Sequence, residues 1–237
     1  MVILFDADSL IFSSCYKKRE NIEDDGFHHN IEDAINKFDE VFMSIINYLE
    51  DIYEINEVKT FSGSKGNFRK YITKKYKANR DYNNLPPLLN EMHQYVKEQY
   101  NSIYGYGCET DDVVAKYWFE LSNLLGRENV IIVSIDKDYK QFPCLMYNYH
   151  IKHKEVYDIS EQEAMYNFYE QMIIGDTVDN VNYCKGYGKK FAEKYLFDCD
   201  TKYQYTKKIY ILFKKIHKSK AKQRYIECYN LLKLRTD

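Results

Sequence analysis

VILFDAD, residues 2–8, is the stretch that decides the fold class of this 237-residue chain. Its first four residues form a continuous apolar run, which is typical of a strand buried on both faces of a parallel sheet. The run ends in Asp6 and Asp8. Because ligands of open α/β sheets bind beyond the carboxyl ends of the strands, we expect these two acids at a functional edge.

Other segments of the chain alternate between strand and helix patterns. Strand patterns occur in EVKTF (57–61), VIIVSI (130–135) and LMYNYHI (145–151). Apolar residues at three- and four-residue spacing predict a long amphipathic helix over residues 31–52, and helical patterns also cover 89–100 and 111–125. This alternation predicts an α/β fold with a largely parallel sheet and right-handed crossovers.

Carboxylates gather where these elements end or begin. The strand VIIVSI runs into Asp136 and Asp138, so two buried strands bring acidic pairs to one edge of the sheet. In GCETDDVVAKYW, residues 107–118, three further acids open a helix that is otherwise apolar: Glu109, Asp111 and Asp112.

Two interpretations of these acids compete. Acids in a first helical turn complement the helix dipole, and Thr110 could cap free N–H groups. Three crowded carboxylates beside a core would repel one another unless a cation lay among them. Local capping explains any one of the acidic groups, whereas three groups converging on one edge favour a metal site.

The length and composition restrict the classes of protein to which this chain can belong. The length suits one large domain, or one domain with a small appendage. The six cysteines form no CxxC pair, and the first residues lack a signal-peptide pattern, so we expect reduced thiols in a cytoplasm. No apolar stretch approaches the roughly 20 residues needed to cross a bilayer. Abundant Tyr, Lys, Asn and Ile hint at an AT-rich genome such as many phages carry.

The formal net charge of −2 hides an uneven distribution of charge. Between Cys199 and the last residue there are eleven Lys and Arg residues against three acids. Such a split fits a protein that holds cations in one place and a polyanion in another. A solvated basic helix is the alternative, and for the tail alone it is slightly favoured.

Five segments, in this order, resemble the 5′-nuclease family: ILFDADSLIF, YKANR, ETDDVVA, VSIDKDYKQF and IIGDTVDNVNYCKGYGKKFAEKYL. The family comprises flap endonucleases, bacteriophage 5′ to 3′ exonucleases and the 5′-nuclease domain of bacterial DNA polymerase I. The resemblance covers residues 1 to about 198. It implies a PIN-like catalytic core over residues 1–170, with a helical arch near 64–105. It also implies a helix-hairpin-helix region and basic helical tail over 171–237.

By position, the resemblance implies a set of acidic metal ligands that includes the acids above and a DxxD pair: Asp6, Glu109, Asp111, Asp112, Asp136, Asp138, Asp176 and Asp179. Carboxylates suit hard divalent ions such as Mg²⁺ or Mn²⁺. Two such ions roughly 4 Å apart can activate water and stabilise the leaving oxygen.

A basic segment, Lys65 to Arg80, holds seven Lys and Arg residues, interleaved with aromatic residues and free of acids. This composition suits a single-stranded 5′ end, with Arg69, Lys70 and Tyr76 as candidate contacts, although a solvated helix is the alternative. The resemblance places Lys77 and Arg80 at the scissile phosphate, where they would stabilise developing charge.

CKGYGKK, residues 184–190, resembles the turn of a helix-hairpin-helix. Gly186 and Gly188 would let the backbone approach a DNA phosphate, Lys189 and Lys190 would add contacts, and the family often binds K⁺ there. The chain departs from the family at Ser62, where most relatives carry an aspartate after the second strand. Asp8 is a possible substitute for that acid.

The resemblance implies a monomeric, metal-dependent 5′ to 3′ exonuclease or flap endonuclease acting on DNA 5′ ends, flaps or nicks. We expect it in the host cytoplasm, in phage replication or primer removal, with RNA:DNA hybrids as further substrates and replication proteins as partners. The alternatives are a PIN-type ribonuclease and a DNA-binding scaffold that has lost catalysis through Ser62. A membrane partner is not expected.

Overall fold

A five-stranded sheet organises the N-terminal two thirds of the molecule. The computed structural model spans residues 1–237 and describes all of them except 20, 22–23, 82 and 237. The strand order is β2-β1-β3-β4-β5, parallel except for the β4–β5 pair. The strands are β1 (Val2–Asp6), β2 (Glu57–Phe61), β3 (Val130–Val133), β4 (Leu145–Asn148) and β5 (Glu155–Asp158). The predicted, largely parallel sheet is confirmed, and the antiparallel edge strand β5 is additional to it.

The register of β1 with its two neighbours, β2 and β3, brings the carboxyl ends of these strands together. Phe5 lies opposite Thr60 of β2 and Val133 of β3, and Asp6 lies opposite Phe61. Every residue of β1 is buried. The acids that follow β1 and β3 therefore meet at one edge, as the apolar runs predict.

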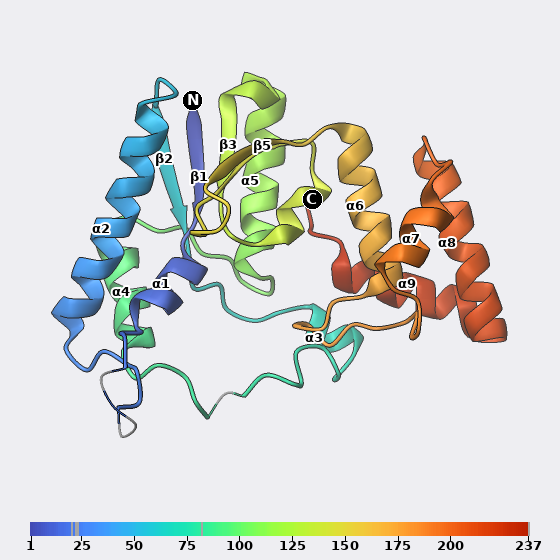
Figure 1. Ribbon diagram of the computed structural model, residues 1–237, viewed down its shortest axis with the longest axis horizontal. Coiled ribbons are helices and arrows are strands. Elements are labelled where there is room, and N and C mark those ends of the chain that lie inside the picture. The colour runs from blue at the N-terminus through green and yellow to red at the C-terminus, as the bar shows by residue number, and fades with distance from the viewer. Residues whose placement is uncertain (20, 22–23, 82, 237) are drawn as a thin grey trace.

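Helices cover both faces of the sheet (Figure 1). Ile3 and Phe5 of β1 pack with one set of helices, α1 (Asp8–Ser14), α2 (Ile31–Glu50) and α4 (Leu89–Gln99). Val2 and Leu4 point the other way and pack with α5 (Thr110–Leu125). The long helix predicted over 31–52 is α2, which ends at Glu50.

A second, helical half contains a core of its own, at the right of Figure 1. It is built from α6 (Glu161–Ile174), α7 (Lys189–Leu196), α8 (Lys202–His217) and α9 (Ala221–Leu232). In α8 the residues Tyr205, Ile209 and Phe213 are buried, while its lysines other than the half-buried Lys208 are exposed. The basic tail thus packs as amphipathic helices, and the chain after α9 returns to the sheet half (Figure 1).

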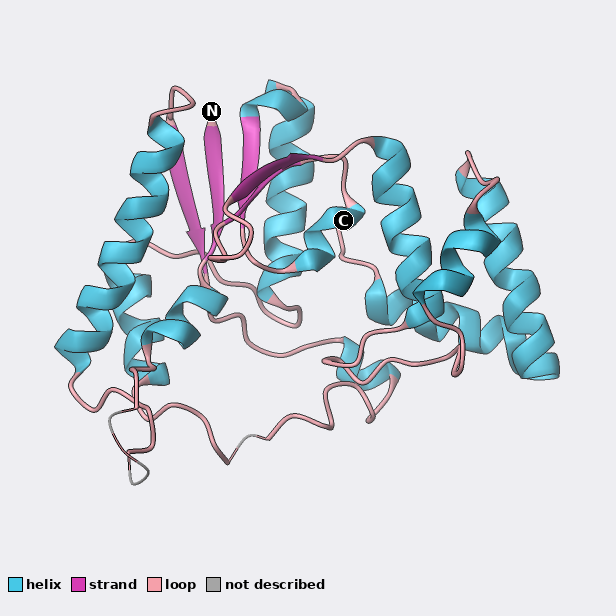
Figure 2. Cartoon of the chain, in the orientation of Figure 1, coloured by secondary structure: helices cyan, strands magenta, loops and turns pink. Residues whose placement is uncertain are grey.

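The segment near 64–105, expected to form a helical arch, is only partly helical. It contains α3 (Arg69–Ile72) and α4, and the described residues between them are turns and irregular chain (Figure 2). Short 3₁₀ helices occur at Arg127–Asn129, Lys137–Gln141 and Lys218–Lys220. Within the described ranges, no helix has the length and apolar character needed to span a membrane.

Candidate active site

Four carboxylates at the carboxyl edge of the sheet, Asp6, Asp111, Asp136 and Asp138, are called here the open carboxylates. Asp6 ends β1, Asp111 lies in the first turn of α5, and the other two follow β3. Their hydrogen bonds come from neutral donors. The Tyr139 hydroxyl donates to Asp6 at 2.8 Å, the backbone N–H of Asp138 donates to Asp136 at 2.9 Å, and the Gln171 amide donates to Asp138 at 2.8 Å.

Among these four groups, the charge of Asp136 repels those of Asp6, Asp111 and Asp138. Burial, reinforced by the charge of Asp8, raises the pKa of Asp6 to about 7. Burial and the charge of Asp136 raise the pKa of Asp138 to about 7. Burial also raises the pKa values of Asp111 and Asp136, with neighbouring carboxylates adding to the effect. A site whose acids all resist ionisation would be stabilised by a cation.

The other four predicted ligands, Glu109, Asp112, Asp176 and Asp179, already pair with cations and are called here the paired carboxylates. Arg69 grips Asp112 with two hydrogen bonds of 2.6 and 2.8 Å, and lies 3.2 Å from Glu109. Lys137 lies 2.9 Å from Asp176. Burial pushes the pKa of Asp176 upward, but the hydrogen bond and charge of Lys137, together with the backbone N–H groups of Asp179 and Val178, outweigh it and the pKa is lowered.

Arg69 and Tyr76 lie inside the protein, which differs from the DNA-contacting positions that the sequence suggested. Arg69 is 1% exposed, and its remaining donors reach the carbonyls of Leu231 and Lys233 at 2.9 and 3.1 Å. Tyr76 is 3% exposed, and its hydroxyl lies 2.6 Å from Glu109 and 2.7 Å from Asp179. A guanidinium with its donors committed in this way has none left for a phosphate, so the structure corrects that assignment.

Lys77 and Arg80 lie at the rim of the site. The ammonium of Lys77 contacts Glu109 and lies 3.4 Å from Asp179, and Arg80 lies 3.1 Å from the same Asp179 oxygen. Burial would raise the pKa of Glu109, but Lys77, Tyr76 and Arg69 together outweigh it and the pKa is lowered. Both cations therefore compensate the charges of Glu109 and Asp179. Lys70 is also exposed, on α3.

The start of α5 is capped in a different way from the one expected. Glu109 is the N-cap residue and forms a capping box with Asp112, whereas the Thr110 hydroxyl donates to Asp8 at 2.6 Å. Asp8 also accepts the backbone N–H of Gly63 at 2.8 Å. Ser62 is 4% exposed and its hydroxyl lies 2.6 Å from that of Ser102. Capping and charge crowding thus coexist at this helix start.

The open carboxylates fit a hard divalent cation by their chemistry. All four supply carboxylate oxygens as ligands. Their raised pKa values show that the cations in the described structure do not compensate their negative charge. Among the residues that the structure describes, no group of three or more His, Cys, Asp or Glu side chains is gathered as ready ligands. The open carboxylates instead accept hydrogen bonds from Tyr139, Gln171 and backbone N–H groups.

The sequence reasoning missed Lys137, Tyr139 and Gln171, which contact the acids of the site. Lys137 and Tyr139 lie within the quoted VSIDKDYKQF segment, where a lysine between two aspartates was the available signal. Gln171 comes from α6, and nothing in its local sequence indicates that it turns toward Asp138.

The predicted phosphate-binding turn is exposed between α6 and α7. Gly186 has a φ of +90°, which favours glycine, and a Cβ at Gly186 or Gly188 would have no neighbour within 4 Å. Lys189 and Lys190 are exposed in the first turn of α7. The turn therefore presents open backbone and two lysines to solvent.

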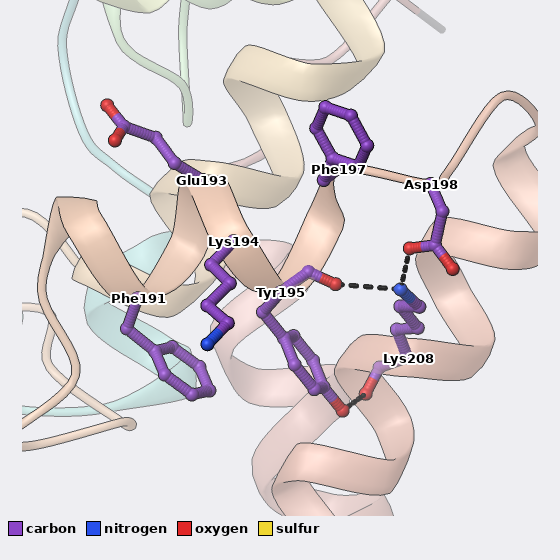
Figure 3. A pocket seen from close by; sticks show the side chains of 7 residues that line it. All are labelled: Phe191, Glu193, Lys194, Tyr195, Phe197, Asp198 and Lys208. Atoms are coloured by element: carbon purple, nitrogen blue, oxygen red, sulfur yellow. Dashed lines mark hydrogen bonds and ion pairs between the residues drawn. The ribbon is translucent and has the colours of Figure 1, made fainter.

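A wider hollow lies between α7 and α8 (Figure 3). Phe191, Tyr195, Phe197 and Lys208 line it, and the Lys208 ammonium donates to the Tyr195 carbonyl at 2.8 Å. The Lys208 ammonium also pairs with Asp198 (Figure 3). This cation is thus used to lock α7 onto α8.

Solved structures with the same architecture include nucleases. A bacteriophage T5 flap endonuclease variant, in a pseudo-enzyme–product complex with DNA and metal ions, has a TM-score of 0.60 at 14% identity, covering 98% of each chain. A T5 5′-exonuclease with bound zinc has a TM-score of 0.59 at 15% identity, covering 98% of this chain and 99% of its own. The catalytic core of Rad2 with DNA substrate has a TM-score of 0.51 at 14% identity, covering 100% of this chain and 79% of its own.

Among curated protein sequences, none matches the chain significantly. The family model described as the 5′-3′ exonuclease, N-terminal resolvase-like domain, matches residues 1–170, which is most of the chain. That match spans the sheet half, the open carboxylates and the basic rim. The chain therefore belongs to the 5′-3′ exonuclease family, and its residues 1–170 correspond to the resolvase-like N-terminal domain of that family.

Proposed function

We propose that this protein is a divalent-metal-dependent nuclease that hydrolyses DNA at 5′ ends, as a 5′ to 3′ exonuclease or flap endonuclease. The observation that carries the proposal is the cluster of mutually repelling open carboxylates beside the Lys77 and Arg80 rim. Family membership and the architecture shared with DNA-bound, metal-bound nucleases support it.

Mg²⁺ or Mn²⁺ would be held by the open carboxylates, with the paired carboxylates completing two ion sites. When bound, such a pair of ions supplies an activated water and stabilises the leaving oxygen. The fold holds these acids close together, because they follow β1 and β3 and lie at the start of α5. Lys77 and Arg80, now on Glu109 and Asp179, would turn toward the scissile phosphate and stabilise its developing charge.

Duplex DNA would be gripped at the turn before α7. Gly186 and Gly188 leave the backbone open to a phosphate, Lys189 and Lys190 flank it, and K⁺ could bind at this turn as in the helix-hairpin-helix of relatives. The open space at Gly188 means that Gly188→Val should fold normally. We expect this variant to bind duplex-containing substrates more weakly while cleaving short single strands nearly as well as the native protein. An equal loss on both would contradict a duplex clamp.

The biological setting that we propose is phage DNA replication. Removal of primers would make RNA:DNA hybrids substrates too, replication proteins would be partners, and a monomer in the host cytoplasm would suffice. The domain division that we propose is a catalytic core over residues 1–170 and a DNA-binding region over 171–237.

One cleavage assay tests the proposal against its alternatives. The purified protein is given 5′-flap DNA, nicked duplex, RNA:DNA hybrid and single-stranded RNA, each with Mg²⁺, Mn²⁺ or Ca²⁺. We expect cleavage of the DNA flap and nick with Mg²⁺ or Mn²⁺ and binding without cleavage in Ca²⁺. Cleavage confined to single-stranded RNA would identify a PIN-type ribonuclease, and DNA binding without cleavage in any metal would identify a scaffold.

A further inference from the structure

A pocket of about 450 Å³ lies beside the open carboxylates, between the end of β2, one face of α4 and the loop before α5. Its volume falls in the range of small-ligand sites. None of the described residues that line it is an acid, in a chain whose net charge is negative. Its charged and aromatic lining consists of Lys65, His93, Lys97, Tyr104 and Tyr106.

The walls of the pocket are fixed by backbone hydrogen bonds. The N–H of Lys65 donates to Gly105 at 2.9 Å, and the N–H of Gly107 donates back to Lys65 at 2.7 Å. The Ser64 hydroxyl accepts the Gly105 N–H at 3.0 Å. The loop that carries the tyrosines is therefore clamped to the loop that carries Lys65.

The cations and aromatic rings form one positively charged wall. The Lys97 ammonium lies 4.7 Å from the centre of the Tyr104 ring, and Tyr106 stands edge-on to that ring at 5.3 Å. A hydrogen bond from Tyr106, together with the charges of Lys97 and Lys65, lowers the pKa of Tyr104. Tyr106 is 73% exposed, so its ring is available for stacking.

The pocket adjoins the catalytic edge through Asp8. The Gly63 N–H, on the pocket side, donates to Asp8, whose own N–H donates to Asp6 at 3.3 Å. The ring nitrogen Nδ1 of His93 is buried without a hydrogen-bond partner among the described residues and lies 4.0 Å from Asp8. A ligand in the pocket would thus sit next to the strand end that carries Asp6.

We propose that this pocket binds the phosphorylated 5′-terminal nucleotide of the DNA strand, with its phosphate on Lys65 and Lys97 and its base on Tyr106. The inference rests on the proposed nuclease function and adds a substrate determinant to it. A terminal phosphate monoester carries nearly two charges near pH 7, which two lysines in an acid-free pocket match better than one diester charge does. The α7–α8 hollow lacks this character because two acids, Glu193 and Asp198, line it, and Asp198 already pairs with Lys208.

The test measures binding in Ca²⁺ to a nicked duplex whose 5′ end carries either a phosphate or a hydroxyl. We expect the phosphorylated end to bind about tenfold more tightly, since hydrogen bonds to charged groups contribute on this scale. Lys97→Gln and Lys65→Gln should each remove most of this preference. Lys152→Gln, at an exposed turn between β4 and β5 on the opposite sheet edge, is the matched control and should keep it.

Stacking is tested separately. Tyr106→Leu should weaken binding of a phosphorylated end at least about fivefold, but should leave binding unchanged when the terminal nucleotide is abasic. A free deoxynucleoside monophosphate should compete only at much higher concentration than the phosphorylated strand. Effective competition at equal concentration would mean that the pocket serves free nucleotides, which overturns the inference.

The outcomes separate this inference from the proposed function. Equal affinity for phosphate and hydroxyl ends in the native protein, or a preference that survives both lysine substitutions, would overturn the pocket assignment even if cleavage is normal. A phosphate preference that depends on Lys65 and Lys97, in a protein that cleaves nothing in Mg²⁺ or Mn²⁺, would support the pocket and refute the nuclease.

Discussion

Asp111 and Asp112 are neighbours in the first turn of α5, yet they belong to opposite electrostatic environments. Asp112 is 3% exposed and held by the buried guanidinium of Arg69. Asp111 faces other carboxylates, and burial raises its pKa. The difference shows that a crowded row of acids can contain both a structural ion pair and an electrostatically strained site, because each side chain leaves the helix in its own direction.

The largest expected effect comes from removing an open carboxylate. Replacing Asp136 or Asp138 with Asn should reduce the cleavage rate in Mg²⁺ on the order of 10³-fold, because a neutral amide cannot hold the ions that the proposed reaction needs. Binding of a 5′ flap in Ca²⁺ should survive, since the basic residues remain. Cleavage assays and binding titrations on the same flap give both quantities. Full activity in both variants would remove Asp136 and Asp138 from the metal site.

The same substitution at the two neighbouring positions should move stability in opposite directions. Asp112→Asn leaves a buried guanidinium without its main partner and should lower the free energy of unfolding by about 3 kcal/mol. Asp111→Asn removes repulsion and should raise it in metal-free buffer. Urea unfolding in EDTA measures both. A shift of the same sign in the two variants would mean that the open and paired environments do not differ as described.

The pH dependence of stability sharpens the comparison further. Asp6 and Asp138 have pKa values of about 7 in the fold, against 3.8 in an unfolded chain, so the folded state retains protons that the unfolded state has lost. Without metal, the free energy of unfolding should therefore fall by several kcal/mol as pH rises from about 4 to 7, and should then level off. Thermal unfolding in EDTA at several pH values checks this. Asp138→Asn should flatten the profile, and a profile unchanged by Asp138→Asn would contradict the assignment.

The smallest effect is expected at Ser62, which lies near the site but is not one of its carboxylates. Its hydroxyl bonds only to Ser102 in the described structure, so Ser62→Ala should change cleavage less than about twofold and cost about 1 kcal/mol of stability. Mg²⁺ titration of the cleavage rate tests whether this side chain touches an ion. A large increase in the half-maximal Mg²⁺ concentration for Ser62→Ala would show that it does, and would move Ser62 into the site.

The sheet and its acidic edge could be predicted because each depends on local pattern. The apolar runs of β1 and β3 are followed at once by Asp6, Asp136 and Asp138, and parallel strands bring their ends together. The short edge strand β5 has exposed ends and no apolar run, so the pattern does not reveal it. Composition identifies Arg69 as a basic residue and Tyr76 as an aromatic one. It does not show that both side chains point into the protein.

The ion pairs could not be predicted because they join distant parts of the chain. Arg69 and Asp112 are 43 residues apart, and nothing in either local sequence selects the other as its partner. Lys77 reaches Asp179 from far along the chain, and the irregular residues that follow it carry no periodic pattern. Long-range charge pairing thus determines which acids are paired, and only the fold reveals it.

The buried Arg69 has a consequence for synthesis of the protein on the ribosome. Its guanidinium binds the carbonyl of Leu231, a partner 162 residues later in the chain. At 5–20 residues per second, translation delivers that partner roughly 8–30 s after Arg69 itself. We expect nascent chains stalled before Leu231 to leave the segment around α3 accessible to protease, whereas released chains protect it.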